Sequence, residues 1–255
     1  MTKQRVALLV SYDGTDFCGW QVQNGQDSIS VQGSMERALS EICGEKIGVT
    51  GSGRTDSGVH ATGQVAHADI PVNIPGPKVR EALNSRLPGT IRILKSRVVP
   101  DDFHSRFGAV RREYGYYISP GIIPPAHRRN YCHYTRRRYN LRELNEIASV
   151  LRGVHDFSTF AAAGDQSKSR TREIFSSSFH REGDLLVFRI AGNAFLWRMV
   201  RSLTGTLLHV ADQGGGPEEM ARRLAAMDRN EAGPTAPSRG LFLEKVEYGS
   251  EYGFF

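Results

Sequence analysis

A guanidinium and a carboxylate are separated by one residue in a glycine-rich segment. Residues 51–69 read Gly-Ser-Gly-Arg-Thr-Asp-Ser-Gly-Val-His-Ala-Thr-Gly-Gln-Val-Ala-His-Ala-Asp, which places Arg54 and Asp56 between glycines, just before a predicted strand. Glycine adopts positive φ and lets a ligand come close, and other residues do so only at a steric cost. The segment is therefore a candidate site, with Asp56 as its candidate nucleophile.

A second charged group lies in a strongly apolar stretch. The pattern over residues 194–211 predicts a helix that is apolar on nearly every face, so Arg198 and Arg201, one turn apart, are expected to be at least partly buried. A buried guanidinium needs a carboxylate partner, because an unpaired buried charge is costly. At about 4 Å and an effective dielectric near 20, the attraction is on the order of 4 kcal/mol, enough to keep an aspartate ionised. We therefore expect Arg201 to pair with Asp56.

Other kinds of site fit the glycine-rich segment less well. It lacks the lysine of a phosphate-binding P-loop, and Asp56 stands where a dinucleotide fingerprint needs glycine or alanine. A nucleophile elbow would need glycine at position 55, which is threonine. Ser57 with His60 or His67 could form a hydrolase pair, an alternative supported only by proximity, and Asp56 could be an ordinary turn residue. The histidines match no metal-binding pattern, so we expect no metal.

Positive charge is concentrated in one part of the chain. The net charge is +6, yet residues 104–142 hold nine arginines, no lysine and a single acidic residue, so this segment carries +8 and the remainder −2. Seven aromatic residues are interleaved with the arginines, and guanidinium groups beside flat rings suit phosphates and stacked bases. A solvated loop over a tyrosine-rich strand is the alternative. The whole pattern favours contact with nucleic acid.

Length and composition limit the protein class. A chain of 255 residues can bury a core without a cofactor, and its three cysteines, with no Cys-x-x-Cys pair, give no disulfide framework. We therefore expect a reducing, cytoplasmic location. The apolar run near the N-terminus is too short for a signal peptide or a membrane span, so we expect no membrane association.

The periodicity predicts an α+β protein of two similar domains, each an antiparallel sheet backed by helices. The predicted boundary gives an N-terminal domain of residues 1–106 with the Asp56 loop, and a C-terminal domain of residues 107–255 with the arginine-rich segment and the Arg201 helix. Predicted strands cover 5–12, 47–52, 64–70, 90–99, 109–118, 174–181, 185–191 and 241–248, and predicted helices 31–43, 77–87, 140–153, 194–211 and 217–227, with an irregular loop at 119–138.

Seven segments, in order and spacing, resemble motifs of the tRNA pseudouridine synthase A family. Gly-Arg-Thr-Asp-Ser-Gly-Val-His at 53–60 is the signature motif. The others are Tyr-Asp-Gly-Thr-Asp-Phe-Cys-Gly-Trp-Gln at 12–21, Asp-Asp-Phe-His-Ser-Arg-Phe at 101–107, Arg-Arg-Glu-Tyr at 111–114, His-Asp-Phe-Ser-Thr-Phe at 155–160, Asn-Ala-Phe-Leu-Trp-Arg-Met-Val-Arg at 193–201 and Gly-Leu-Phe-Leu at 240–243.

The resemblance implies an isomerase that converts uridine to pseudouridine in the anticodon stem-loop of tRNA, at positions 38, 39 and 40, without cofactor or metal. It also implies a homodimer, and two similar domains with a basic RNA-binding cleft between them. Two departures are Ser57, where alanine is common, and Trp197-Arg198, where histidine is frequent. Arg198 would add charge near the site and alter RNA contacts.

The resemblance also implies roles for individual residues. Asp56 would be the nucleophile, Arg201 its ion-pair partner, Tyr114 the ring that packs on the target uracil, and Arg54 the group that helps to flip the nucleotide. Arg106, Arg111, Arg112 and the arginines of 128–138 would hold phosphates without reading sequence.

Two questions stay open at the level of the sequence. The attack of Asp56 on C6 or C1′ and a glycal route are all compatible with these residues, and Tyr114 is only a candidate for the base that removes the C5 proton. A non-catalytic RNA-binding or RNA-chaperone protein with the same basic cleft is the alternative function. Such a protein would have no reason to hold an acid among phosphates.

Overall fold

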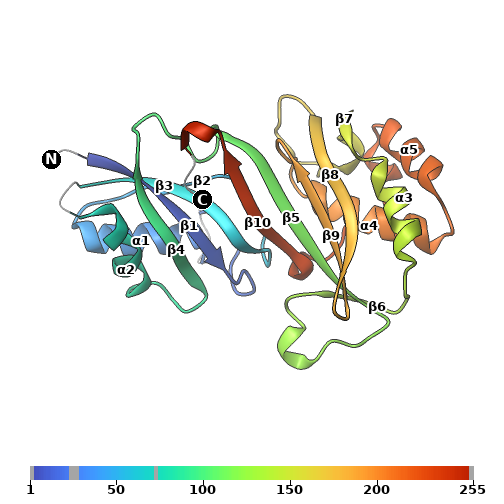
Figure 1. Cartoon of the computed structure of the whole chain (residues 1–255), viewed down its shortest axis with the longest axis horizontal. Coiled ribbons are helices and arrows are strands. Elements are labelled where there is room, and N and C mark those ends of the chain that lie inside the picture. The colour runs from blue at the N-terminus through green and yellow to red at the C-terminus, as the bar shows by residue number, and fades with distance from the viewer. Residues whose placement is uncertain (1–2, 23–28, 72–73, 253–255) are drawn as a thin grey trace. The chain divides into compact units, whose positions relative to one another are not determined.

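The computed structural model describes residues 3–22, 29–71 and 74–252. By its internal contacts the chain forms a first unit, up to Val110 and again from Phe242, and a second unit, from Arg111 to Leu241. Each unit combines a mainly antiparallel sheet with helices (Figure 1), so the predicted α+β class is confirmed. The C-terminus differs from the predicted 107–255 domain, because the last strand joins the first unit by pairing with one of its strands.

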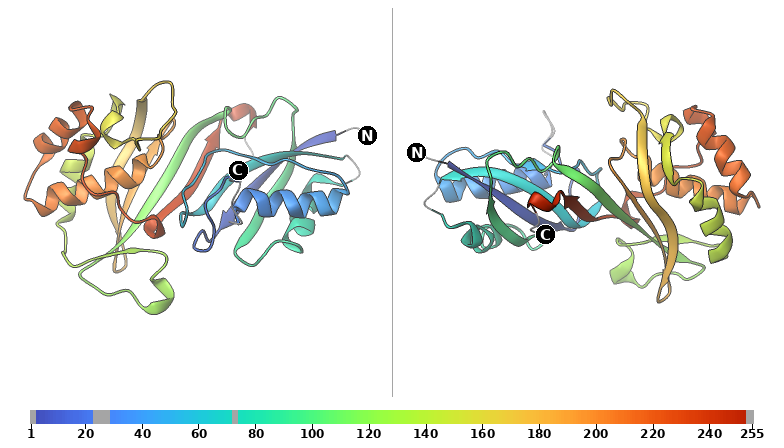
Figure 2. Two further views of the ribbon diagram at one scale, coloured as in Figure 1. Left: turned by 180° about the vertical axis from the view of Figure 1, so that it is seen from behind. Right: turned by 45° about the horizontal axis from the view of Figure 1, so that its top comes forward.

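The first unit has the predicted order of elements, β-α-β-β-α-β. Its central strand β1 pairs antiparallel with β3 on one side and β4 on the other, and β10 lies parallel to β3. Seen from behind, α1 crosses one face of this sheet (Figure 2). The elements are β1 (Lys3–Tyr12), α1 (Val31–Cys43), β2 (Thr50–Gly51), β3 (His60–Pro71), α2 (Gly76–Asn84), β4 (Ile91–Val99) and β10 (Leu241–Tyr248).

Helix α1 shows how closely local sequence can define an element. The Ser30 hydroxyl accepts a hydrogen bond from the Gly33 amide at 3.1 Å, which caps the N-terminus. Gly44 ends the helix with a left-handed φ of 70°, a conformation that glycine adopts without a Cβ penalty. Both ends were predicted from these residues and are confirmed.

The second unit contains a sheet with the order β5-β9-β8-β7. The tight β8–β9 hairpin turns at Gly183, whose φ is 58°, as its Glu-Gly-Asp sequence predicts. Helix α3 packs against β8 and also contacts α4 and α5. The elements are β5 (Ala109–Pro120), β6 (His133–Thr135), α3 (Leu141–Ser149), β7 (Gly153–Asp156), β8 (Thr171–Glu182), β9 (Leu185–Gly192), α4 (Met199–Asp212) and α5 (Pro217–Ala225).

Helix α4 begins five residues later than predicted. The Asn193 side chain accepts a hydrogen bond from the Ala194 amide at 2.7 Å, and the Asp165 carboxylate accepts one from the Trp197 amide at 2.6 Å. Both amides are therefore bonded to side chains. Arg198 then takes a left-handed φ of 60° as the residue before the helix. The expectation that Arg198 is buried one helical turn from Arg201 is therefore wrong, since Arg198 is exposed and outside the helix.

The segment predicted as an irregular loop contains a short strand. Residues His133–Thr135 form β6, which pairs in parallel with the end of β5, where Ile118 lies opposite His133. The prolines that argued against regular structure precede this strand and leave its amides intact. Across the part of the chain that the structure describes, no helix is both long and apolar enough to cross a membrane.

Candidate active site

The Asp56 loop of the first unit is fixed by the segment that follows β1. The Trp20 amide donates to the Thr55 carbonyl at 3.1 Å, and the buried hydroxyls of Tyr12 and Thr55 lie 2.8 Å apart. Gly19 and Asp56 form an isolated β-bridge. The backbone at Asp56 is therefore held by tertiary contacts as well as by its own sequence.

Two glycines make this arrangement possible. Gly19 has a φ of 112°, and a Cβ there would lie 2.4 Å from the Thr55 carbonyl oxygen. Gly58 has a φ of 74°, and its amide donates to the Phe17 carbonyl at 3.3 Å. The conformation and the close approach thus require glycine at Gly19, a requirement that is visible only in the folded chain.

The downstream end of the loop is anchored by a buried histidine. His60 is 1% exposed, and its Nδ1 accepts from the Gly14 amide at 3.0 Å and lies 3.1 Å from an Asp13 carboxylate oxygen. Its ring stacks on Phe242 of β10, with centroids 4.6 Å apart. We interpret His60 as a structural residue that fixes where the loop enters β3.

The hydrolase alternative has little support in these contacts. The Ser57 hydroxyl donates to the Phe17 carbonyl at 3.2 Å. His67, the other candidate base, accepts from the Ser105 amide at 3.2 Å, and burial lowers its pKa to about 4, with the positive charges of Arg5 and His104 acting in the same direction. A base with so low a pKa is a poor proton acceptor at neutral pH.

The two charged residues of the loop differ in exposure. Asp56 is half-buried and its carbonyl accepts from the Val59 amide at 3.2 Å, whereas Arg54 is exposed. Asp56 is therefore part of a turn through its backbone, and the residue remains partly accessible to solvent.

The second unit carries the other predicted site residues. Tyr114 on β5 is 8% exposed, and its ring meets Phe195 edge to face at 5.1 Å. Arg201, in the first turn of α4, is half-buried, and its Nε donates to the Ala236 carbonyl at 2.8 Å while the Ala236 amide donates to the Arg201 carbonyl at 3.1 Å. These two bonds tie Arg201 to the segment that precedes β10.

A further arginine, not predicted from the sequence, holds this segment in place. Arg229 donates to the Ser202 hydroxyl at 2.8 Å and to the Thr235 hydroxyl at 2.9 Å. A Cβ at Gly205 would lie 1.7 Å from the Pro234 carbonyl oxygen, so the segment packs directly on the backbone of α4. Nothing in the sequence near Arg229 marks this role, because its partner Ser202 lies 27 positions away along the chain.

Four arginines that the sequence predicts as RNA contacts fall into two groups. Arg106 and Arg198 are exposed, and their guanidinium groups lie 5.8 Å from the Phe107 ring and 4.9 Å from the Trp197 ring. Arg111 lies 3.2 Å from the Glu113 carboxylate, and Arg112 is 9% exposed and donates to the Asn193 carbonyl at 2.6 Å. Arg111 and Arg112 thus have structural partners, and the side chains of Arg106 and Arg198 are exposed.

A family model described as tRNA pseudouridine synthase matches residues 8–108 and 147–249, most of the chain. The chain belongs to the tRNA pseudouridine synthase family. As a member of that family it is an enzyme of the isomerase class, and the resemblance in its motifs is confirmed. The match includes the Asp56 loop and Arg201, whereas Tyr114 and most of the arginine-rich segment lie between the matched stretches.

Curated relatives agree over nearly the full length of the synthase. A Treponema denticola protein is 44% identical over 251 residues, which cover 96% of this chain and 93% of the relative. A Halalkalibacterium halodurans protein is 43% identical, covering 93% of this chain and 90% of the relative. A Rhodopseudomonas palustris protein is 41% identical, covering 96% and 99%. All three are named tRNA pseudouridine synthase A.

The described residues of the synthase form no cluster of metal-binding side chains. Between residues 3 and 252, leaving aside 23–28 and 72–73, no three His, Cys, Asp or Glu side chains gather in a way that could hold a metal ion. His60 and His67, the histidines nearest to the Asp56 loop in sequence, instead have the partners described above.

Proposed function

We propose that the synthase converts uridine to pseudouridine in the anticodon stem-loop of tRNA, at positions 38, 39 and 40, with Asp56 as its nucleophile. The observation that carries this proposal is the Asp56 loop itself. Gly19 and Trp20 hold its backbone, Tyr12 bonds to the Thr55 hydroxyl, and the loop lies inside a stretch that matches the family model. A nucleophile held by its surroundings loses little entropy when it meets the substrate.

The reaction rearranges bonds within one nucleotide. The target base leaves the helical stack, which costs a few kcal/mol and needs replacement contacts, for which Arg54 and the Tyr114 ring are our candidates. The bond between C1′ and N1 breaks, the uracil turns, and a bond forms between C1′ and C5. C5 then loses its proton and N1 gains one, so that atoms balance. Attack by Asp56 at C6 or C1′ and a glycal route all satisfy this balance.

Arg201 and Tyr114 complete the proposed catalytic group. Arg201 would pair with Asp56 and keep it ionised, and its Nε bond to the Ala236 carbonyl supports this role by limiting the orientation of the guanidinium. Tyr114 would pack on the uracil, and its contact with Phe195 supports a ring held in one orientation. Arg106, Arg111, Arg112 and the arginines of 128–138 would hold phosphates, and Arg198 would add charge that alters RNA contacts.

We further propose that the synthase is a homodimer and acts in the cytoplasm, where its tRNA substrate is found. The dimer follows from the family resemblance. Sedimentation equilibrium of the purified protein tests it, and a monomer at micromolar concentration would contradict it.

Tritium release from uridine C5 tests the proposed reaction. A tRNA transcript labelled at C5 is incubated with wild type, Asp56→Asn and the matched control Asp184→Asn, which changes an exposed aspartate in the β8–β9 turn. We expect release by wild type and the control and none by Asp56→Asn, with tRNA binding retained in all three. Binding without release by wild type would favour the RNA-chaperone alternative.

A further inference from the structure

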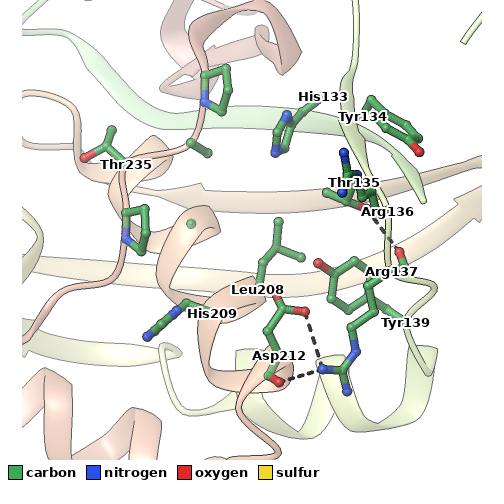
Figure 3. Close-up of a pocket in the computed structure, with 14 residues that line it drawn as sticks. His133, Tyr134, Thr135, Arg136, Arg137, Tyr139, Leu208, His209, Asp212 and Thr235 are labelled. Carbon is green, nitrogen blue, oxygen red and sulfur yellow. Dashed lines mark hydrogen bonds and ion pairs between the residues drawn. The ribbon is translucent and has the colours of Figure 1, made fainter. Parts of the chain in front are cut away.

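A pocket in the second unit contains none of the residues of the proposed catalytic group. It has a volume of about 650 Å³, within the range typical of small-ligand sites. Three segments line it: residues 133–139 with β6, residues 205–212 of α4, and residues 234–237 (Figure 3). The first of these lies in the arginine-rich stretch that the family model does not cover.

The walls of this pocket combine apolar surfaces with aromatic rings. Leu208 and Ala236 are buried, and Pro234 and Pro237 add rigid apolar surfaces to the lining. Figure 3 shows the Tyr139 ring directed towards Leu208 and the His133 ring above it. Such walls suit a flat, partly apolar ring with polar edges, which is the shape of a nucleobase.

Charge at the pocket favours an anionic ligand. Arg137 donates to the Asp212 carbonyl at 2.6 Å and lies 3.6 Å from its carboxylate, so this acid is already paired with a cation. Arg136 is exposed and makes no ion pair with any residue that the structure describes. One uncompensated cation at the pocket would attract a phosphate and repel a lysine or arginine of another protein.

His133 supplies a polar group that lacks a partner. Its Nδ1 is buried, and no described residue makes a hydrogen bond to it. Burial lowers the pKa of His133, so the ring is neutral at pH 7 and can either donate or accept. A turn about the Cβ–Cγ bond keeps the ring in place and can present this nitrogen to a base edge, which then supplies the missing hydrogen bond.

We propose that this pocket binds one unstacked nucleotide of the tRNA other than the target uridine, with its base between the His133 side and Leu208 and its phosphate at Arg136. The proposal rests on the proposed function for the identity of the RNA. It adds an anchoring contact away from the reacting base, which would select tRNAs that can expose a nucleotide at the right distance.

Substitutions at the pocket, each with a matched control, test this site. His133→Phe keeps a ring but removes both nitrogens, and its control is His127→Phe, at an exposed histidine outside the pocket. We expect His133→Phe to weaken tRNA binding about tenfold with the melting temperature unchanged, and His127→Phe to bind as wild type. Equal affinities for the two variants would overturn the proposal.

Crosslinking locates the nucleotide directly. A tRNA transcript containing 4-thiouridine is irradiated with the synthase, and crosslinked peptides are identified by mass spectrometry. We expect crosslinks to residues 133–139 that disappear with Arg136→Glu and remain with Arg152→Glu, an equal charge change on an exposed arginine outside the pocket and outside the arginine-rich segment. Bound tRNA without such crosslinks would contradict the proposal.

Two further measurements separate the alternatives. One distinguishes nucleotide binding from dimerisation at this pocket, and the other tests the pocket assignment independently of the proposed reaction. If the pocket variants shift the monomer–dimer equilibrium in sedimentation and bind tRNA normally once the dimer is restored, a second copy of the chain occupies the pocket and the proposal is wrong. If wild type forms the crosslink but releases no tritium from C5-labelled tRNA, the proposed function fails while the pocket assignment stands.

Discussion

At the scale of single residues, the positioning of Asp56 depends on side chains that touch its neighbours. The paired hydroxyls of Tyr12 and Thr55 are buried, so loss of the Tyr12 hydroxyl removes the partner that Thr55 has in this pair. A buried polar group left unpartnered costs about 1–3 kcal/mol. These residues are therefore expected to affect catalysis although neither needs to touch the substrate.

Tyr12→Phe should lower the turnover rate of pseudouridine formation several-fold and leave tRNA affinity unchanged. The reason is that Thr55, next to Asp56, loses its hydrogen bond. Thermal unfolding and single-turnover kinetics of Tyr12→Phe, Thr55→Val and the double variant measure the coupling, which we expect to be about 1 kcal/mol. Additive effects would show that this contact does not position the loop.

His67 makes stability depend on pH. Its folded pKa of about 4 lies below its ordinary 6.5, so between these values the unfolded chain takes up a proton that the folded chain does not. Stability conferred by the neutral buried ring is therefore present above pH 6.5 and is lost as the pH falls towards 4. Urea unfolding over this range should show a smaller pH slope for His67→Gln than for wild type, and equal slopes would refute the assignment.

At the scale of elements, glycines with the same sign of φ have different reasons to be glycine. Gly44 ends α1 at a φ of 70°, and a Cβ added there would meet no atom within 4 Å, whereas at Gly19 a Cβ would lie 2.4 Å from the Thr55 carbonyl oxygen. Replacement at Gly44 therefore adds only backbone strain. At Gly19 it adds a backbone clash in the segment that holds Asp56.

Gly19→Ala should destabilise the synthase more than Gly44→Ala, for which we expect a loss of about 1 kcal/mol. Gly19→Ala should also reduce activity in the fraction that remains folded, because the Thr55 carbonyl must move. Denaturant unfolding and tritium release for both variants check this expectation. Equal stability and equal activity of the two variants would show that the close approach at Gly19 does not matter for function.

Local sequence predicts an element well where its ends are determined by neighbouring residues. Ser30 and Gly44 were sufficient for α1, and the glycine-rich motif located the loop at Asp56. The start of α4 was not predictable, because it depends on a hydrogen bond from the Trp197 amide to Asp165, a residue 32 positions away. The role of Arg229 was hidden for the same reason.

At the scale of the whole molecule, the first unit is discontinuous in sequence. Strand β10 lies parallel to β3, with Phe242 opposite His60, and a Cβ at Gly63 would lie 2.0 Å from the Glu244 carbonyl oxygen. The second unit is thus an insertion between β4 and the last strand of the first unit. The order of elements alone assigned β10 to the second domain, since sequence order does not reveal which strand a C-terminal strand pairs with.

A fragment that ends at Val110 should not fold stably, because it lacks β10 and leaves β3 unpaired on that side at His60 and Ala61. Joining residues 242–252 to this fragment through a flexible linker should restore cooperative unfolding. Circular dichroism and thermal melts of the two fragments measure the difference. Cooperative folding of the short fragment would show that β10 is dispensable.

The contact between Phe242 and His60 also has a consequence for biosynthesis. The ring that stacks on the anchor of the Asp56 loop is translated only after the whole second unit. While the ribosome is still making the second unit, the Asp56 loop lacks this support. A message cut short before Phe242 would therefore yield polypeptides that still carry the arginine-rich segment but lack the ring that supports the Asp56 loop, so the fold makes this support conditional on translation as far as β10.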